Sequence, residues 1–194
     1  MKDNKKLLNV GENLKNQEPE ETRIPPNNSG GLNISAVGFS KAGNELDASE
    51  KSQPIYSSDP GIVADLKRAA MLFQKLELGD AEAIYRKILD KDRSQPVALN
   101  MLGAIAFAAR DYEQAIDFIK MAIVEDSEYS AAYNNLGRVF GATGRHEEAV
   151  EALNHCLRLN PTDSIAHYNM GCSLLGLRQL DSAMASANKA VSLA

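Results

Sequence analysis

The chain has 194 residues, of which 44% are hydrophobic and 24% are charged, and its net charge at pH 7 is −5. This acidic surplus disfavours nucleic acid as a partner, because binding to phosphate backbones needs an excess of lysine and arginine. The longest apolar stretch has nine residues, 101–109, whereas a helix needs about 20 to cross a bilayer. With only two cysteines and no apolar leader after the N-terminal lysines, the chain is expected to be cytoplasmic and not inserted in a membrane.

Residues 1–58 differ in composition from the rest of the chain. They contain four of the seven prolines but only two of the eleven aromatic residues. Because so few apolar residues cannot bury enough surface to offset chain entropy, we predict a disordered tail that acts as a linker. The alternative is a short motif, at 7–14 or 32–39, that folds on a partner.

Ordered structure is predicted to begin at Asp59 and Pro60, a pair that is typical of a helix start. After this point the sequence repeats with a period of 34 residues, and one column of the repeat holds only small residues: Ala69, Gly103, Gly137 and Gly171. Such a period predicts stacked helical units rather than one globular core. The predicted domain, 59–194, divides into four repeats: 62–95, 96–129, 130–163 and 164–194.

Each repeat is predicted to contain two helices. In the third repeat, apolar residues follow a helical period at 132–140 and again at 149–157. Glycines separate the two segments, and Asn160-Pro161 ends the second one. In the second repeat, Asp111 and Gln114 are expected to form a capping box. The recurring glycines and alanines are expected where two helices cross closely, because only a small residue leaves room there.

Three segments of the third repeat carry a family resemblance: NLGRVF at 135–140, GRHEEA at 144–149 and LNP at 159–161. They resemble the tetratricopeptide repeat of bacterial-type proteins, and the resemblance covers residues 62–194. It implies an all-α fold, an α-solenoid of about four helix-turn-helix repeats, with a concave groove that holds peptides or partner proteins. The first repeat departs from the pattern, since it has Ala69 in place of the glycine, as expected for a capping unit.

Helix geometry places a set of candidate binding residues on the groove side of the first helices. This set consists of Asn100, Asn134, Asn135, Arg138, Tyr168, Asn169 and Cys172. Because an amide offers both a donor and an acceptor, recurring asparagines can bond the main chain of an extended peptide. The pattern is similar to the asparagine ladder of O-linked N-acetylglucosamine transferases. The alternative interpretation is that each asparagine bonds the neighbouring helix.

The sequence predicts no catalytic residue, metal ligand set or cofactor. His155 and Cys156 are adjacent, so on a helix they point in directions about 100° apart and do not suit one metal ion. Cys156 and His146 fall in columns of mostly apolar residues, which indicates packing. Cys172 has no evident base beside it that would make its thiol a nucleophile. The chain is therefore expected not to be an enzyme.

The predicted function is a non-catalytic scaffold that binds a peptide or a partner protein in the groove. The alternative is the substrate-recruiting region of a larger enzyme. Stretches such as LGDAEAIYRKIL look similar to repeats that precede glycosyltransferase or sulfotransferase domains, and the catalytic domain would then lie beyond residue 194.

The fourth repeat is predicted to expose an apolar face, because no polar capping helix follows its second helix. This face is expected to contain Leu174, Leu177, Met184, Ala187 and Val191. Three explanations stay open: the chain is a fragment of a longer protein, the face pairs with a partner or with a second copy, or a small exposed patch is tolerated.

Overall fold

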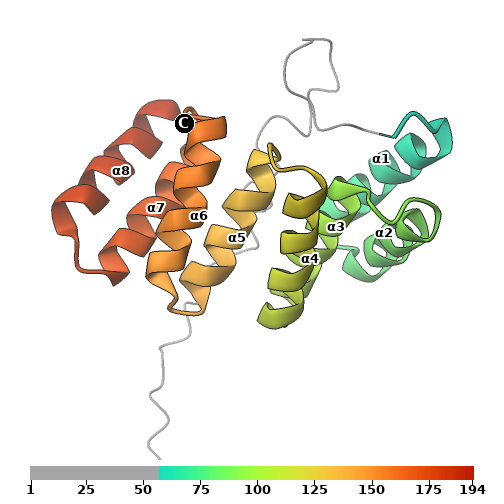
Figure 1. Cartoon of the computed structure of the whole chain (residues 1–194), viewed down its shortest axis with the longest axis horizontal. Coiled ribbons are helices and arrows are strands. Elements are labelled where there is room, and N and C mark those ends of the chain that lie inside the picture. The colour runs from blue at the N-terminus through green and yellow to red at the C-terminus, as the bar shows by residue number, and fades with distance from the viewer. Residues whose placement is uncertain (1–56) are drawn as a thin grey trace, which may run out of the picture. The chain divides into compact units, whose positions relative to one another are not determined.

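The computed structural model describes residues 57–194, so the predicted tail and its two candidate motifs fall outside the described residues. Residues 57–194 form eight α-helices and no strand (Figure 1), which confirms the all-α prediction. The helices are α1 (Pro60–Gln74), α2 (Leu78–Lys91), α3 (Pro96–Ala108), α4 (Tyr112–Glu125), α5 (Ser130–Ala142), α6 (His146–Leu159), α7 (Ser164–Gly176) and α8 (Leu180–Leu193).

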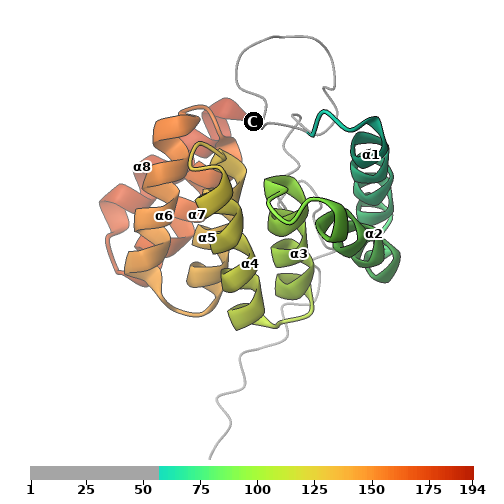
Figure 2. The ribbon, with the colours of Figure 1, turned by 45° about the vertical axis from the view of Figure 1, so that its right-hand side comes forward.

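The helices pair in chain order. Only three residues separate the two helices of each pair, and so short a turn returns the second helix antiparallel along the first. The first helices are α1, α3, α5 and α7, and the second helices are α2, α4, α6 and α8. Each second helix also contacts the first helix of the next pair, so the pairs stack into a solenoid, as Figures 1 and 2 show.

The stack bends toward its first helices. From α3 onward, the first helices of neighbouring repeats contact one another, α3 with α5 and α5 with α7, whereas contacts between neighbouring second helices are sparser. The exposed side of the first helices is therefore the inner side of the bend, which is where the sequence placed the candidate binding residues.

The recurring glycine stands where the two helices of a repeat cross. A Cβ atom added at Gly137 would lie 2.5 Å from Leu153 Cγ, and one added at Gly103 would lie 2.5 Å from Ile119 Cγ1. At Gly171 the nearest atom, the carbonyl oxygen of Ala183, would be 3.3 Å away. The close crossing is therefore tightest in the two interior repeats and relaxed in the fourth.

The turn between the paired helices has the same backbone conformation in all four repeats. One residue in each turn has a positive φ, and these residues are spaced by 34 positions: Leu76, Arg110, Gly144 and Arg178. The next backbone N–H donates to a carbonyl five residues back at 2.9 to 3.0 Å in each repeat, as from Arg145 to Phe140. This pattern is the Schellman motif, which favours glycine at its left-handed position.

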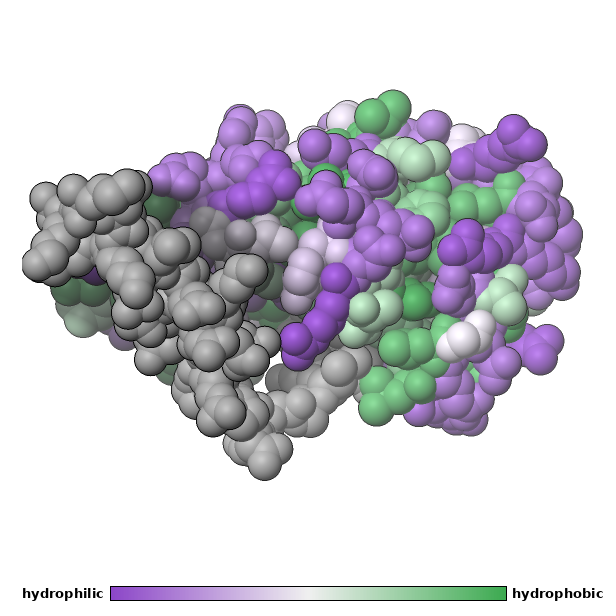
Figure 3. Space-filling model, turned by 90° about the horizontal axis from the view of Figure 1, so that it is seen from below, coloured by the Kyte–Doolittle hydropathy of each residue, from purple (hydrophilic) through white to green (hydrophobic). Residues whose placement is uncertain are grey.

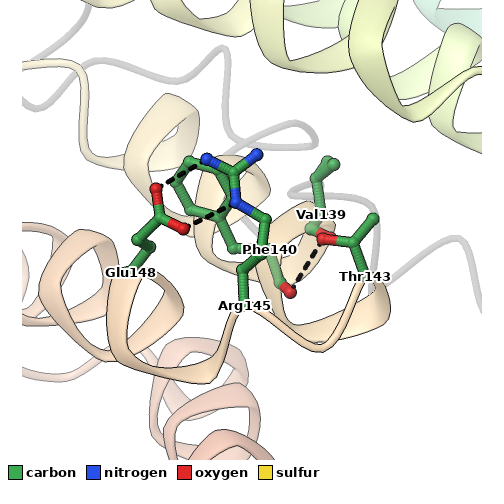
Figure 4. A network of polar contacts seen from close by, with 5 residues as sticks. All are labelled: Val139, Phe140, Thr143, Arg145 and Glu148. Atoms are coloured by element: carbon green, nitrogen blue, oxygen red, sulfur yellow. Dashed lines mark hydrogen bonds and ion pairs between the residues drawn. The ribbon is translucent and has the colours of Figure 1, made fainter.

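Side chains reinforce the turn of the third repeat (Figure 4). The hydroxyl of Thr143 faces the carbonyl oxygens of Val139 and Phe140 at 3.1 and 3.0 Å. The guanidinium of Arg145 donates to both carboxylate oxygens of Glu148 at 2.6 Å and lies 4.3 Å from the centre of the Phe140 ring. This ion pair lowers the pKa of the Glu148 carboxyl. Because the pair is exposed, it orients the turn more than it stabilises the fold.

Side chains cap the helix starts as the sequence predicted. The carboxylate of Asp59 accepts from the N–H of Gly61 at 2.7 Å, and α1 begins at Pro60. The carboxylate of Asp111 accepts from the N–H of Gln114 at 3.2 Å, which is one half of the expected capping box. Each cap satisfies a backbone donor that has no partner within the helix.

The core runs along the whole stack between the helix layers, from Ile62 in α1 to Ala190 in α8. On the coloured part of the face seen in Figure 3, hydrophilic residues alternate with groups of hydrophobic residues. One sequence expectation is wrong: Leu174 is buried, because α7 turns it toward Leu153 and Ala183 rather than toward the open end. Leu175 and Leu180 are exposed there in its place.

Candidate functional site

Asparagines join the first helices of successive repeats through two hydrogen bonds. The amide nitrogen of Asn135 in α5 donates to the amide oxygen of Asn100 in α3 at 2.9 Å, and that of Asn169 in α7 donates to that of Asn134 in α5 at 2.9 Å. Asn100, Asn134 and Asn135 are each only 2% exposed. This is the geometry that the second interpretation of the asparagines expects, in which each amide bonds the neighbouring helix.

The Asn135–Asn100 pair makes one further hydrogen bond and has one acceptor that is not used. Asn100 donates to the hydroxyl of Tyr129 at 3.3 Å. The amide oxygen of Asn135 is buried and has no hydrogen-bond partner among residues 57–194. The bonds therefore fix the spacing of the first helices, because a buried amide that loses its partner is destabilising. They leave Asn169, which is half-buried at the surface, as the asparagine that a partner can reach.

A depression of about 200 Å³ lies between α5 and α7. It brings together three of the predicted binding residues, Arg138, Asn169 and Cys172. Its other lining residues are Phe107, Gly137, Gly141, Ala142, His146 and Ser173. None of the lining residues is acidic, and Arg138 is the arginine among them.

Arg138 lies over an aromatic ring. Its guanidinium carbon lies 4.4 Å from the centre of the Phe107 ring, which is cation–π distance. Burial lowers the pKa of Arg138 to about 10, so the side chain still carries its charge at pH 7. A positive charge in partly buried surroundings attracts an anionic group more strongly than one in bulk water.

Tyr168 and Cys172 lie one turn apart on α7, and both are exposed. Cys172 lines the depression, and Tyr168 does not. The neighbouring Cys172 raises the pKa of the Tyr168 hydroxyl by its charge and by a hydrogen bond. Tyr168 occupies the column that Asn100 and Asn134 fill in the preceding repeats. An aromatic side chain therefore stands in α7 where α3 and α5 carry an asparagine.

Family comparison decides the type of repeat. Models described as tetratricopeptide repeat match residues 66–131, 130–163 and 165–194. The chain belongs to the tetratricopeptide repeat (TPR) family. No curated protein matches the sequence.

Solved structures share the TPR fold at modest identity. A crystal structure of MamA is 26% identical with a TM-score of 0.60, and the match covers 68% of this chain and 77% of MamA. Pseudomonas aeruginosa pilF is 25% identical with a TM-score of 0.60, and the match covers 68% of this chain and 60% of pilF. A mutant of the Thermobaculum terrenum O-GlcNAc transferase is 25% identical with a TM-score of 0.58, covering 62% of this chain and 23% of the transferase.

His146 and Cys172 both line the depression, whereas the other cysteine and the other two histidines make structural contacts elsewhere in the TPR array. Cys156 is buried, and burial raises the pKa of its thiol to about 12. The ring of His155 stacks on Tyr133 with 5.2 Å between ring centres, and that of His167 lies 3.1 Å from the carbonyl oxygen of Pro161. Across 57–194, no group of three or more His, Cys, Asp or Glu residues could hold a metal ion. Nor is any helix in that range long and apolar enough to cross a membrane.

Six lining residues of the depression were not predicted as site residues, and three of them, His146, Phe107 and Ser173, have side chains larger than a methyl group. His146 was assigned to packing, and its ring does fill the space beside Gly176. Its Nδ1 is buried and has no hydrogen-bond partner within the described part of the chain. Phe107 and Ser173 belong to the second and fourth repeats. A depression that draws on three repeats leaves no signal in the pattern of one repeat, so only the stacking of α3, α5 and α7 reveals it.

Proposed function

We propose that this TPR scaffold captures an extended segment of a partner protein along its first helices, anchored in the depression at Arg138. The observation that carries the proposal is the convergence of Arg138, Asn169 and Cys172 on one hollow of about 200 Å³. TPR proteins serve as protein-interaction scaffolds, and a concave site with a few polar groups is the usual form of a binding site. Residues 1–58 would act as a tether, and the two unpaired cysteines favour a reducing compartment such as the cytoplasm.

The chemistry of the depression favours an acidic residue in the bound segment. A carboxylate can accept from the guanidinium of Arg138, which Phe107 already holds in place. The amide nitrogen of Asn169 is used by Asn134, so its oxygen is the atom that can accept from a backbone N–H of the segment. The exposed ring of Tyr168 offers apolar contact beside both groups.

A peptide array tests this proposal. Peptides of varied sequence with a central glutamate are spotted beside matched peptides with a central glutamine, and the labelled chain is applied. The wild-type chain is expected to bind a subset of glutamate peptides more strongly than their glutamine counterparts. Arg138→Gln should abolish that difference by removing the cation. Lys120→Gln on α4 is the control, since Lys120 is exposed on a second helix.

The test is decided by the preference for glutamate peptides over glutamine peptides, and not by binding alone. If Arg138→Gln keeps the preference for glutamate while circular dichroism shows an intact helical fold, the anchor is not at Arg138 and the proposal is wrong. If Lys120→Gln loses the preference as well, the effect is one of net charge and the depression is not the site.

A second candidate function is the recruiting region of a larger transferase. It is favoured by the likeness to the O-GlcNAc transferase, whose matched part is 23% of that protein. Sequencing the gene downstream of the Ala194 codon separates the two. An open reading frame for a transferase domain would support the second candidate, and a stop codon there would rule it out.

A further inference from the structure

Helix α8 presents an apolar stripe to solvent. Leu180, Met184, Ala187 and Val191 are spaced by four, three and four residues, so they form one face of the helix. Leu180 is 67% exposed, Met184 62% and Val191 79%. Tyr168 and Leu175 on α7 are exposed as well. Large apolar groups that are exposed together along one helix face are typical of an interaction surface.

The same positions are covered in the interior repeats. Ile116 and Ile119 on α4 correspond to Met184 and Ala187, and both are buried. Leu153 on α6, which also corresponds to Ala187, is fully buried. In these repeats the packing face of the second helix receives the first helix of the next repeat. The stripe on α8 occupies the same place in the fourth repeat, but its large residues are exposed.

A second copy of the chain offers two faces that could cover the stripe. One is the outward side of α1, which carries Ala64, Lys67, Arg68 and Met71, all exposed. Docking this side on α8 would bury two cations against leucine, methionine and valine, which is strongly unfavourable. The other face is the stripe itself, which contains no charge. Charge therefore disfavours head-to-tail stacking and favours the pairing of like faces.

We propose that the chain forms a two-fold symmetric dimer in which α8 packs antiparallel against α8 of a second copy. In this arrangement Leu180 of one copy faces Val191 of the other, and Met184 of one copy faces Ala187 of the other. Large side chains then meet small ones at the centre, and the two helix dipoles oppose each other. A two-fold axis makes the interface self-complementary and closes the assembly at two copies.

The dimer is expected to be weak. Helix α8 has 14 residues and is about 21 Å long, so one helix pair buries less than the ~800 Å² per partner of a standard stable interface. Association should therefore fall in the micromolar range. Analytical ultracentrifugation of the whole 194-residue chain is the measurement, over about 5 to 500 μM.

Two methionine variants make the test specific. Met184→Glu places like charges across the two-fold axis and should raise the dimer Kd at least tenfold. Met121→Glu is the matched control, since Met121 on α4 is 50% exposed but lies off the stripe, and it should leave the Kd unchanged. Circular dichroism checks that both variants keep the helical fold of the wild-type chain.

Three results would overturn the proposal. The first is a wild-type chain that stays monomeric throughout the concentration range. The second is a dimer that Met121→Glu weakens as much as Met184→Glu, which would move the contact to another face. The third is a series of species larger than the dimer that Met71→Glu removes, because that series would show head-to-tail stacking through α1.

Discussion

The outward faces of α1 and α8 lie in the first and fourth repeats and are built from opposite kinds of residue. Lys67 and Arg68 on α1 are exposed where Met101 and Leu102 on α3 are buried. On α8, Met184 is exposed and apolar where the interior repeats have a covered apolar residue. The first repeat therefore meets water with charges, as a cap does, whereas the fourth repeat meets it with the packing face of an interior unit.

The largest difference in stability effects between an interior repeat and the fourth repeat is expected at the glycine where the paired helices cross. Gly137→Ala should lower the free energy of unfolding by about 1 to 3 kcal/mol, because the new Cβ overlaps Leu153 and overpacks the crossing. Gly171→Ala should change it by less than about 0.5 kcal/mol, since the gain in helix propensity offsets the milder approach to Ala183. Urea denaturation followed by circular dichroism measures both, and equal losses would mean that the fourth repeat is packed like the third.

The asparagine column gives the next largest contrast. Asn135→Ala should destabilise the chain by about 1 to 3 kcal/mol, because Asn100 loses its donor in a buried place. Lys67 occupies the same column in α1 and is exposed, so Lys67→Ala should change stability by less than about 0.5 kcal/mol. The same denaturation series compares them. A loss at Lys67 as large as that at Asn135 would show that α1 is not a solvent-facing cap.

The repeat period predicted the fold well because each repeat places the same residue types in the same contacts. The glycine column, the two helices per repeat and the Asp59 and Asp111 caps follow from local spacing alone. The hydrogen bond from Asn135 to Asn100 does not follow from local spacing. Its two residues are 35 positions apart, whereas the repeat aligns residues that are 34 apart. Such a bond depends on the rotation of one repeat against the next, which no single repeat encodes.

The candidate site was predicted in part for the same reason. Arg138, Asn169 and Cys172 were placed on the groove side and do line one depression. Phe107 could not be predicted as the support of Arg138, because its place depends on how far α3 approaches α5. Leu174 was assigned to the open end in error, since it was judged from its own helix without the helix that covers it.

The left-handed residue of each turn gives a smaller expected effect on the free energy of unfolding, about 1 kcal/mol. Gly144 adopts a φ of 76°, which suits glycine, whereas Arg178 in the fourth repeat adopts 59°. Gly144→Ala should destabilise the chain by about 1 kcal/mol, and Arg178→Gly should stabilise it by about the same amount if the fourth turn is equally well formed. Thermal unfolding of the two variants gives the sign of each effect. No gain from Arg178→Gly would indicate that the terminal turn relaxes away from the left-handed conformation.

The smallest effect on stability is expected from removing the two positive charges on the outward side of α1. Lys67→Asn with Arg68→Leu gives α1 the residue types found at the same positions in α5, Asn135 and Leu136. Because both sites are exposed, the free energy of unfolding should change by less than about 0.5 kcal/mol. Association should change more, since the outward side of α1 then resembles the first helix that an apolar second-helix face receives. Sedimentation velocity should show species larger than a dimer at high concentration, and adding Met184→Glu should remove them by placing charge on the receiving face. If the double variant sediments like the wild-type chain, charge on α1 is not what prevents head-to-tail association. The geometry of the helices at the two ends would then explain why they associate differently.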